Sequence, residues 1–172
     1  MKEIILYLFV AMLSVSCTDN ISRKESKYMP YDSGDVLVFE NPKNTLLDTI
    51  FISKIDRYVS DGPKIYFNES IKAYDKKGDY IIHLSAGYLK YPDSYLKIRG
   101  LSGRHCIKDL NKKTEISLST RTMSFDDVIL IEKESGGNSE IIKIYWSKSK
   151  GIVQFEKDNH TIWQLISLSS YK

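Results

Sequence analysis

The stretch IIKIYWSKSKGIVQFEKDNHTIWQLISL, residues 141–168, decides the fold class. It contains three apolar runs separated by two polar turns, at 148–150 and 158–159. Within each run apolar residues tend to recur at every second position, which is the period of a strand buried on one face. The pattern predicts a three-stranded antiparallel meander, with strands at 141–147, 151–156 and 161–168.

The same kind of pattern continues upstream of this block. Within residues 45–59 the apolar parity switches, which predicts a β-bulge near Ser53. Residues 107–110 predict one short helical turn, and no longer stretch has a helical period. Short apolar runs bounded by Gly, Pro, Asn and Asp predict strands at 36–39, 45–59, 64–74, 80–88, 95–99, 116–120 and 128–131.

These patterns together predict an all-β fold. The spacing of the turns indicates an antiparallel meander of about nine or ten strands, preceded by a signal-peptide helix. We expect the sheet either to curl into a barrel-like or half-barrel shape or to fold as a sandwich. The chain has 172 residues, which predicts one domain with a substantial core.

The first seventeen residues, MKEIILYLFVAMLSVSC, have the pattern of an export signal. Lys2 is followed by an uncharged run, Ile4 to Leu13, that is much shorter than the ~20 residues of a membrane span. The small residues before Cys17 resemble a bacterial lipobox, although Ser14 stands where the usual pattern has leucine. Relaxed lipoboxes of this kind resemble those of Bacteroidota. The resemblance implies a diacylglycerol on the Cys17 thiol, and the alternatives are a plain signal peptide or a buried N-terminal helix.

The lipobox resemblance divides the chain into three parts. Residues 1–16 are the predicted lipoprotein signal peptide. Residues 17–30 are the lipidated cysteine and a polar, flexible tether. Residues 31–172 are the single β domain. Lipidation of Cys17 leaves Cys106 as the second of two cysteines, so no intramolecular disulfide is expected, and Cys106 is read as a small buried residue, a free thiol or an intermolecular bridge.

Two further blocks carry a family resemblance. YMPYDSGDVLVF, residues 28–39, and IYWSKSKGIVQFEKDNHTIWQLI, residues 144–166, are similar to small Bacteroidota cell-envelope lipoproteins of unassigned function. This resemblance implies an outer-membrane lipoprotein, on either the periplasmic or the surface-exposed face. It supplies no catalytic residue and no cofactor.

The residues typical of catalysis and metal binding are dispersed. His83, His105 and His160 lie far apart in the sequence and lack the spacing of a metal site. Asp126 and Asp127 are adjacent and would point to opposite faces of a strand. No catalytic residue, metal site or cofactor is therefore predicted, and the protein is interpreted as a non-enzyme. The net charge of +3 is too small to indicate nucleic-acid binding.

Two surface features are candidates for binding or modification. Tyr88, Tyr91 and Tyr95 cluster near a turn, where tyrosine rings could stack on a sugar or a protein partner, or simply cover sheet edges. Asp48-Thr49-Ile50 matches a short O-glycosylation pattern of Bacteroidota exported proteins, with Thr49 as the acceptor.

Three functional hypotheses follow. The first is a membrane-anchored envelope lipoprotein whose β domain binds or scaffolds without catalysis, with the membrane as one partner and a glycan or envelope protein as another. The second is a carrier of a lipid or other apolar ligand, enclosed by a curved sheet. The third is an unrecognised hydrolase.

Overall fold

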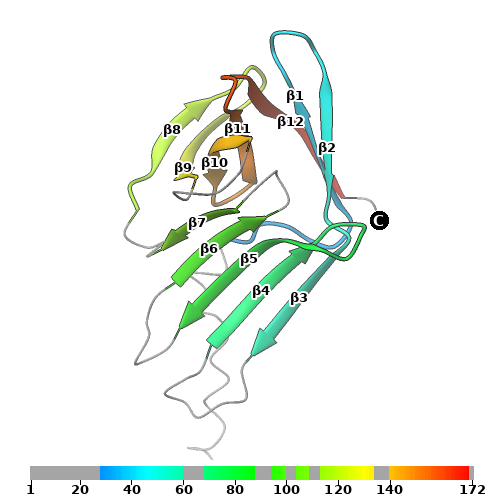
Figure 1. Ribbon diagram of the computed structural model, residues 1–172, viewed down its shortest axis with the longest axis vertical. Helices are drawn as coiled ribbons and strands as arrows, with labels where there is room; N and C mark the ends of the chain where they lie inside the picture. Colours follow the sequence, from blue (N-terminus) through cyan, green and yellow to red (C-terminus); the bar gives the residue numbers. More distant parts are fainter. Residues whose placement is uncertain are drawn as a thin grey trace, which may run out of the picture.

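The computed structural model describes residues 28–59, 68–87, 94–99, 104–108, 113–133 and 140–170. Within these residues the chain is all-β, with twelve strands in two antiparallel sheets (Figure 1). The strands are β1 (Asp35–Glu40), β2 (Leu47–Phe51), β3 (Lys54–Val59), β4 (Asn68–Tyr74), β5 (Tyr80–Gly87), β6 (Ser94–Arg99), β7 (Arg104–Lys108), β8 (Ile116–Ser119), β9 (Ser124–Glu132), β10 (Ile141–Ser147), β11 (Gly151–Lys157) and β12 (Ile162–Ser170).

The larger sheet has seven strands in the order β2-β1-β12-β11-β10-β9-β8. Its second half is the meander that the sequence predicts, extended by β8 and β9. The hairpin β1–β2 joins this meander through β12, with Asp35 opposite Ser170 and Glu40 opposite Gln164. The smaller sheet is a simple meander of five strands, β3-β4-β5-β6-β7. In sequence it lies wholly between β2 and β8, which are the two edge strands of the larger sheet.

The chain passes from one sheet to the other at a two-residue corner. The Ile52 N–H donates to the Asp35 carbonyl at 2.8 Å in the larger sheet, while the next residue, Ser53, donates its N–H to the Tyr74 carbonyl at 2.8 Å in the smaller one. The predicted single strand over 45–59 with a bulge near Ser53 is therefore wrong. The switch of apolar parity is real, but its cause is the change of sheet, since consecutive residues here face different partners.

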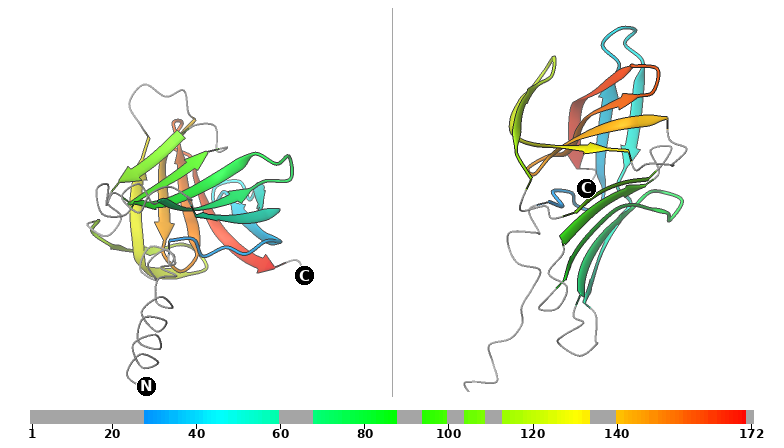
Figure 2. Two further views of the ribbon diagram at one scale, coloured as in Figure 1. Left: turned by 90° about the horizontal axis from the view of Figure 1, so that it is seen from below. Right: turned by 60° about the vertical axis from the view of Figure 1, so that its left-hand side comes forward.

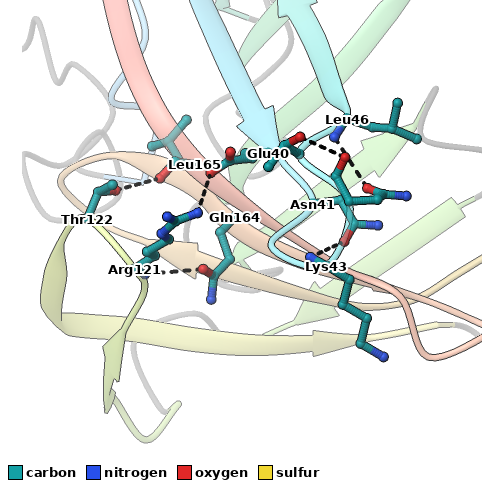
Figure 3. A network of polar contacts seen from close by, with 10 residues as sticks. Glu40, Asn41, Lys43, Leu46, Arg121, Thr122, Gln164 and Leu165 are labelled. Atoms are coloured by element: carbon teal, nitrogen blue, oxygen red, sulfur yellow. Dashed lines mark hydrogen bonds and ion pairs between the residues drawn. The ribbon is translucent and has the colours of Figure 1, made fainter.

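The larger sheet is strongly curved but does not close into a barrel (Figure 2). At one end the turn between β8 and β9 reaches back to β12 and β1 (Figure 3). The Arg121 N–H donates to Gln164 Oε1 at 3.2 Å, and the Arg121 guanidinium lies 3.8 Å from Glu40 Oε2. Side chains bridge this gap in place of a ladder of backbone hydrogen bonds, so the prediction of a curled sheet holds in its coarse form and a closed barrel is excluded for the described residues.

Both sheets contribute to one hydrophobic core. In β1, which contains the strand predicted at 36–39, the side chains alternate, with Leu37 and Phe39 completely buried between half-buried valines. The aromatic centre of the core includes Trp146, which is also completely buried, and a parallel stack of Phe155 on Trp163 with centroids 6.0 Å apart. The smaller sheet adds aliphatic residues to the same cluster, namely Ile71, Ala73, Ile81, Ile82, Leu84, Leu96 and Ile98.

The number of strands exceeds the predicted nine or ten for two reasons. The stretch 45–59 is two strands, and β7 overlaps the helical turn predicted at 107–110. The backbone of β7 pairs with β6, where Ile107 lies opposite Leu96. Pairing with a neighbouring strand outweighs the weak local helical preference of so short a segment.

The segment before β1 is fixed by Tyr31. Its ring is buried against Trp146 in an edge-to-face contact with centroids 5.8 Å apart, and its hydroxyl accepts a hydrogen bond from the Ile152 N–H at 2.6 Å. Gly151 has a φ of 76°, and a Cβ on it would lie 2.0 Å from the Tyr31 hydroxyl oxygen. Glycine is therefore required here both by backbone conformation and by the close approach of Tyr31.

We expect Gly151→Ala to be strongly destabilising. The left-handed conformation costs a residue with a Cβ about 1–2 kcal/mol, and displacing Tyr31 adds the loss of a buried hydrogen bond of about 1–3 kcal/mol. Gly78→Ala is the matched control, because Gly78 has a φ of 84° and nothing within 4 Å of the added Cβ. Urea denaturation of the two variants measures the difference, and equal losses would contradict a steric role for Tyr31.

Stability should also decrease at alkaline pH because of Tyr31. Burial raises the pKa of Tyr31 above its ordinary value, although the hydrogen bond from Ile152 opposes this rise. Above pH ~10 the unfolded chain releases the phenol proton and the folded chain keeps it, so the unfolded state is favoured as pH rises. The stability difference between the wild type and Tyr31→Phe should narrow by about 1.4 kcal/mol from about pH 9 to about pH 11. A constant difference over this range would show that Tyr31 ionises normally.

Candidate functional site

The structure describes only some of the candidate site residues that the sequence predicts. Cys17, Tyr88 and Tyr91 lie outside the described residues. Tyr95 lies in β6, with its backbone opposite Ser85 and Lys108. Thr49 lies in β2 of the other sheet and is exposed. The tyrosine surface and the modification site therefore stay predictions, and the structure does not bring Thr49 and Tyr95 together in one sheet.

The histidines are also on separate elements. His83 lies in β5, His160 lies in the turn between β11 and β12, and the backbone of His105 lies in β7. Over the described part of the chain, no three His, Cys, Asp or Glu side chains are grouped as a metal site would require.

Asp127 is a carboxylate with two hydrogen-bond donors from the end of β10 and the turn that follows it. It accepts hydrogen bonds from the Ser147 hydroxyl at 2.7 Å and from the Ser149 N–H at 2.8 Å. Partial burial alone would raise the pKa of Asp127, but the hydrogen bonds from these two serines outweigh it and hold the pKa below its ordinary value. The Ser147 hydroxyl in turn accepts from the Lys150 N–H at 3.1 Å. This group stabilises the turn between β10 and β11, and its hydroxyl is engaged in that turn rather than presented as a nucleophile.

A cleft between the two sheets is the best-formed concave site. It has a volume of about 330 Å³. Its floor is apolar and comes from both layers: Ile82 and Ile98 from β5 and β6, and Ile152 and Phe155 from β11. All four side chains are 1% exposed. These residues belong to the core, and the cleft lies over them where the two sheets separate.

The mouth of the cleft is charged and is formed by three segments. The outer wall is the stretch 48–51 of β2, and the opposite wall is the β4–β5 turn, where Lys76 and Lys77 are exposed. Lys157, at the end of β11, completes the mouth. The three lysines outnumber the two aspartates of the lining, Asp48 and Asp75.

Local bonding determines which of these charges are available to a ligand. The Asp75 carboxylate accepts from the N–H groups of Lys77 at 2.8 Å and Asp79 at 3.0 Å, so it stabilises its own turn. The Lys157 ammonium lies 3.9 Å from Glu140. Lys76 lies 3.6 Å from the centroid of the Phe51 ring, a cation–π contact that links the turn to β2. Lys77 has no ion pair with any described residue and is the cation most available to an anionic ligand.

Sequence reasoning missed this cleft. The isoleucines of the floor have the alternation of ordinary core positions, and Lys76-Lys77 has the pattern of a polar turn. Only the doubled lysine beside Gly78 gave any signal. The two walls meet because the corner at Ile52–Ser53 carries the chain from β2 into the smaller sheet. The sequence pattern at this corner predicts only a β-bulge.

Comparison with known proteins identifies no relative. No protein-family model, curated protein or solved structure matches the chain. The described residues include no helix long and apolar enough to span a membrane.

Proposed function

We propose that this protein is a membrane-anchored lipoprotein of the cell envelope, in the outer membrane, whose β domain binds a small amphiphile without catalysis. The site is the cleft between the sheets. The observation that carries the proposal is the combination of an apolar floor, built from both sheets, with a mouth that holds three lysines. An apolar group would lie on the isoleucines and an anionic group would lie at Lys77.

The size of the cleft favours a small ligand. Its volume of about 330 Å³ is near the lower end of the range for small-molecule sites, about 300–1,000 Å³. It accommodates one short acyl chain or one aromatic group, and it is too small for a lipid with several chains. We therefore retain the hypothesis of an apolar-ligand carrier only for a small ligand. The hypothesis of a non-catalytic binding domain is favoured, because the mouth opens between exposed side chains of β2 and the β4–β5 turn.

The cleft is tested by filling it. Ile81 lines the cleft and is 9% exposed, whereas Ile162 in β12 is 38% exposed and lies away from it. We expect Ile81→Trp to weaken binding of anilinonaphthalene sulfonate by about tenfold or more, and Ile162→Trp to leave it unchanged. Fluorescence titration measures both, with near-ultraviolet circular dichroism as the check on folding. Equal affinity of two folded variants would rule out the cleft as the site.

The charge requirement has its own control. Decanoate and decanol share an apolar chain, and only decanoate is anionic. Lys77→Glu should weaken displacement of the probe by decanoate and leave displacement by decanol unchanged. Lys150 is exposed and lies outside the cleft, so Lys150→Glu, which makes the same change of charge, should affect displacement by neither decanoate nor decanol. If the two lysine variants behave alike, the anionic end of the ligand does not lie at Lys77.

The anchor is tested separately. Cys17→Ser removes the thiol to which the lipid would be attached, and two or three acyl chains are what make such anchoring stable. We expect this variant to be soluble or unprocessed in cell fractionation, while Cys106→Ser stays with the membrane. If Cys17→Ser matures normally and still sediments with membranes, the lipid anchor is disproved.

A further inference from the structure

The edge strands differ in how they are protected against pairing with another chain. Edge strands expose unpaired backbone groups, and proteins protect them with charged side chains, bulges or short length. β3 carries three charged side chains, Lys54, Asp56 and Arg57, and Lys54 and Asp56 form an ion pair at 2.8 Å. β8 has four residues and an irregular register between Ile116 and Leu118.

β2 has weaker protection, because its one charged side chain is Asp48. Its five residues, LDTIF, pair with β1 in continuous register and include no lysine, proline or bulge. Exposed apolar side chains gather on it and on the preceding turn: Leu46 is 58% exposed, Leu47 62% and Phe51 36%. These are three of the six large hydrophobic side chains exposed in the described chain.

The backbone of β2 presents a regular set of groups to solvent. The hydrogen bonds that join β2 and its flanking residues to β1 use the even-numbered residues on the β2 side. The Ile52 N–H donates to the Asp35 carbonyl, and the Leu46 carbonyl accepts from the Asn41 N–H. In an antiparallel ladder the alternate residues point the other way. The N–H and C=O groups of Leu47, Thr49 and Phe51 therefore face outward along the free edge.

The hairpin that carries this edge is well ordered by local bonds. Asn41 is 3% exposed, and its side-chain oxygen accepts from the Lys43 N–H at 3.0 Å (Figure 3). The Asn41 carbonyl also accepts from the Thr45 N–H at 2.9 Å. The edge is therefore held in an extended shape before any partner arrives, which lowers the entropic cost of pairing.

We propose that β2 pairs antiparallel with β2 of a second copy of this chain, about a two-fold axis through Thr49. In this register Thr49 lies opposite Thr49 of the second copy, and Leu47 lies opposite Phe51 in both directions. The three outward residues of each strand then exchange backbone hydrogen bonds, and the two larger sheets become continuous across the dimer.

The sequence of β2 complements itself in this register. Apolar Leu47 and Phe51 meet, and threonine pairs with threonine, both of which are favourable cross-strand pairs. Asp48 lies opposite Ile50. Shifting the register by two residues, so that the axis passes through Asp48, would place two carboxylates directly opposite each other, which is unfavourable.

Asp48 regulates the edge in the isolated chain. Its carboxylate accepts a hydrogen bond from the Thr49 N–H at 2.8 Å, and this is the central donor that pairing requires. Pairing exchanges this bond for one to the carbonyl of Thr49 in the second copy. Asp48→Ala removes the competing acceptor, so it should strengthen dimerisation.

The dimer is expected to be weak in dilute solution, because one short strand pair buries little surface. Attachment of both copies to one membrane, as proposed above, would raise their effective concentration. Sedimentation of the purified protein over a range of concentrations gives a readout that does not depend on the anchor or on the ligand cleft.

Disulfide trapping tests the register, in a Cys106→Ser background. Opposed residues of an antiparallel pair have Cα atoms about 5.5 Å apart, within the range that a disulfide bridges. Thr49→Cys should therefore form a cross-linked dimer rapidly on mild oxidation of membranes and of concentrated protein. Leu47→Cys is the matched control on the same edge, because its copies would lie about 13 Å apart. A mixture of Leu47→Cys and Phe51→Cys chains should cross-link to each other.

Equal rates of cross-linking for Thr49→Cys and Leu47→Cys would overturn the proposal. Faster cross-linking between Thr49→Cys and Phe51→Cys chains than within Thr49→Cys would also overturn it, because it indicates another register. In sedimentation, Thr49→Lys places two charges on the axis and should weaken association about tenfold or more, while Ile162→Lys should not. Association that persists in Thr49→Lys would also overturn it. The intact mass of the wild-type protein, compared with that of Thr49→Ala, completes the test. A glycan on Thr49 would block the edge and exclude the dimer.

Discussion

The pairing of β1 with β12 holds the two ends of the β domain together. It joins residues near the start of the described chain to residues near its end, from Asp35 opposite Ser170 to Glu40 opposite Gln164. Closing a loop of this length costs on the order of 4 kcal/mol in chain entropy. Burial of Leu37, Phe39 and Leu165, all completely inaccessible, opposes that cost. Without this pairing the β1–β2 hairpin would have no sheet to extend.

The position of β2 follows from that pairing and determines both proposed sites. β1 places β2 at the edge of the larger sheet, and the corner at Ile52–Ser53 then turns the chain into the smaller sheet. The β4–β5 turn thereby faces β2, where Lys76 contacts Phe51. Residues 48–51 of β2 form one wall of the ligand cleft, and the free backbone edge of the same strand is the proposed dimer contact. A single short strand therefore carries two surfaces with different chemistry.

Several polar groups that resemble active-site chemistry have structural roles. The carboxylate of Asp127 and the hydroxyl of Ser147 stabilise a turn, and the carboxylate of Asp75 organises another. Tyr31, buried beside Gly151, fixes the segment before β1 to β11. The proposed binding function is consequently supported by shape and by lysine charge at the cleft, and these residues contribute to it only by holding the walls in place.

The all-β class, the C-terminal meander and most turns can be predicted from local patterns, because they depend on alternation and on turn residues such as Gly151. The parity switch near Ser53 is also visible in the sequence. Three features become visible only once the chain is folded: this switch separates two sheets, β7 is a strand, and β2 lies beside Lys76 and Lys77. These features depend on which distant segments pair, and a period of two is the same whichever sheet a strand joins. The cleft exists only between paired layers, so no local pattern could reveal it.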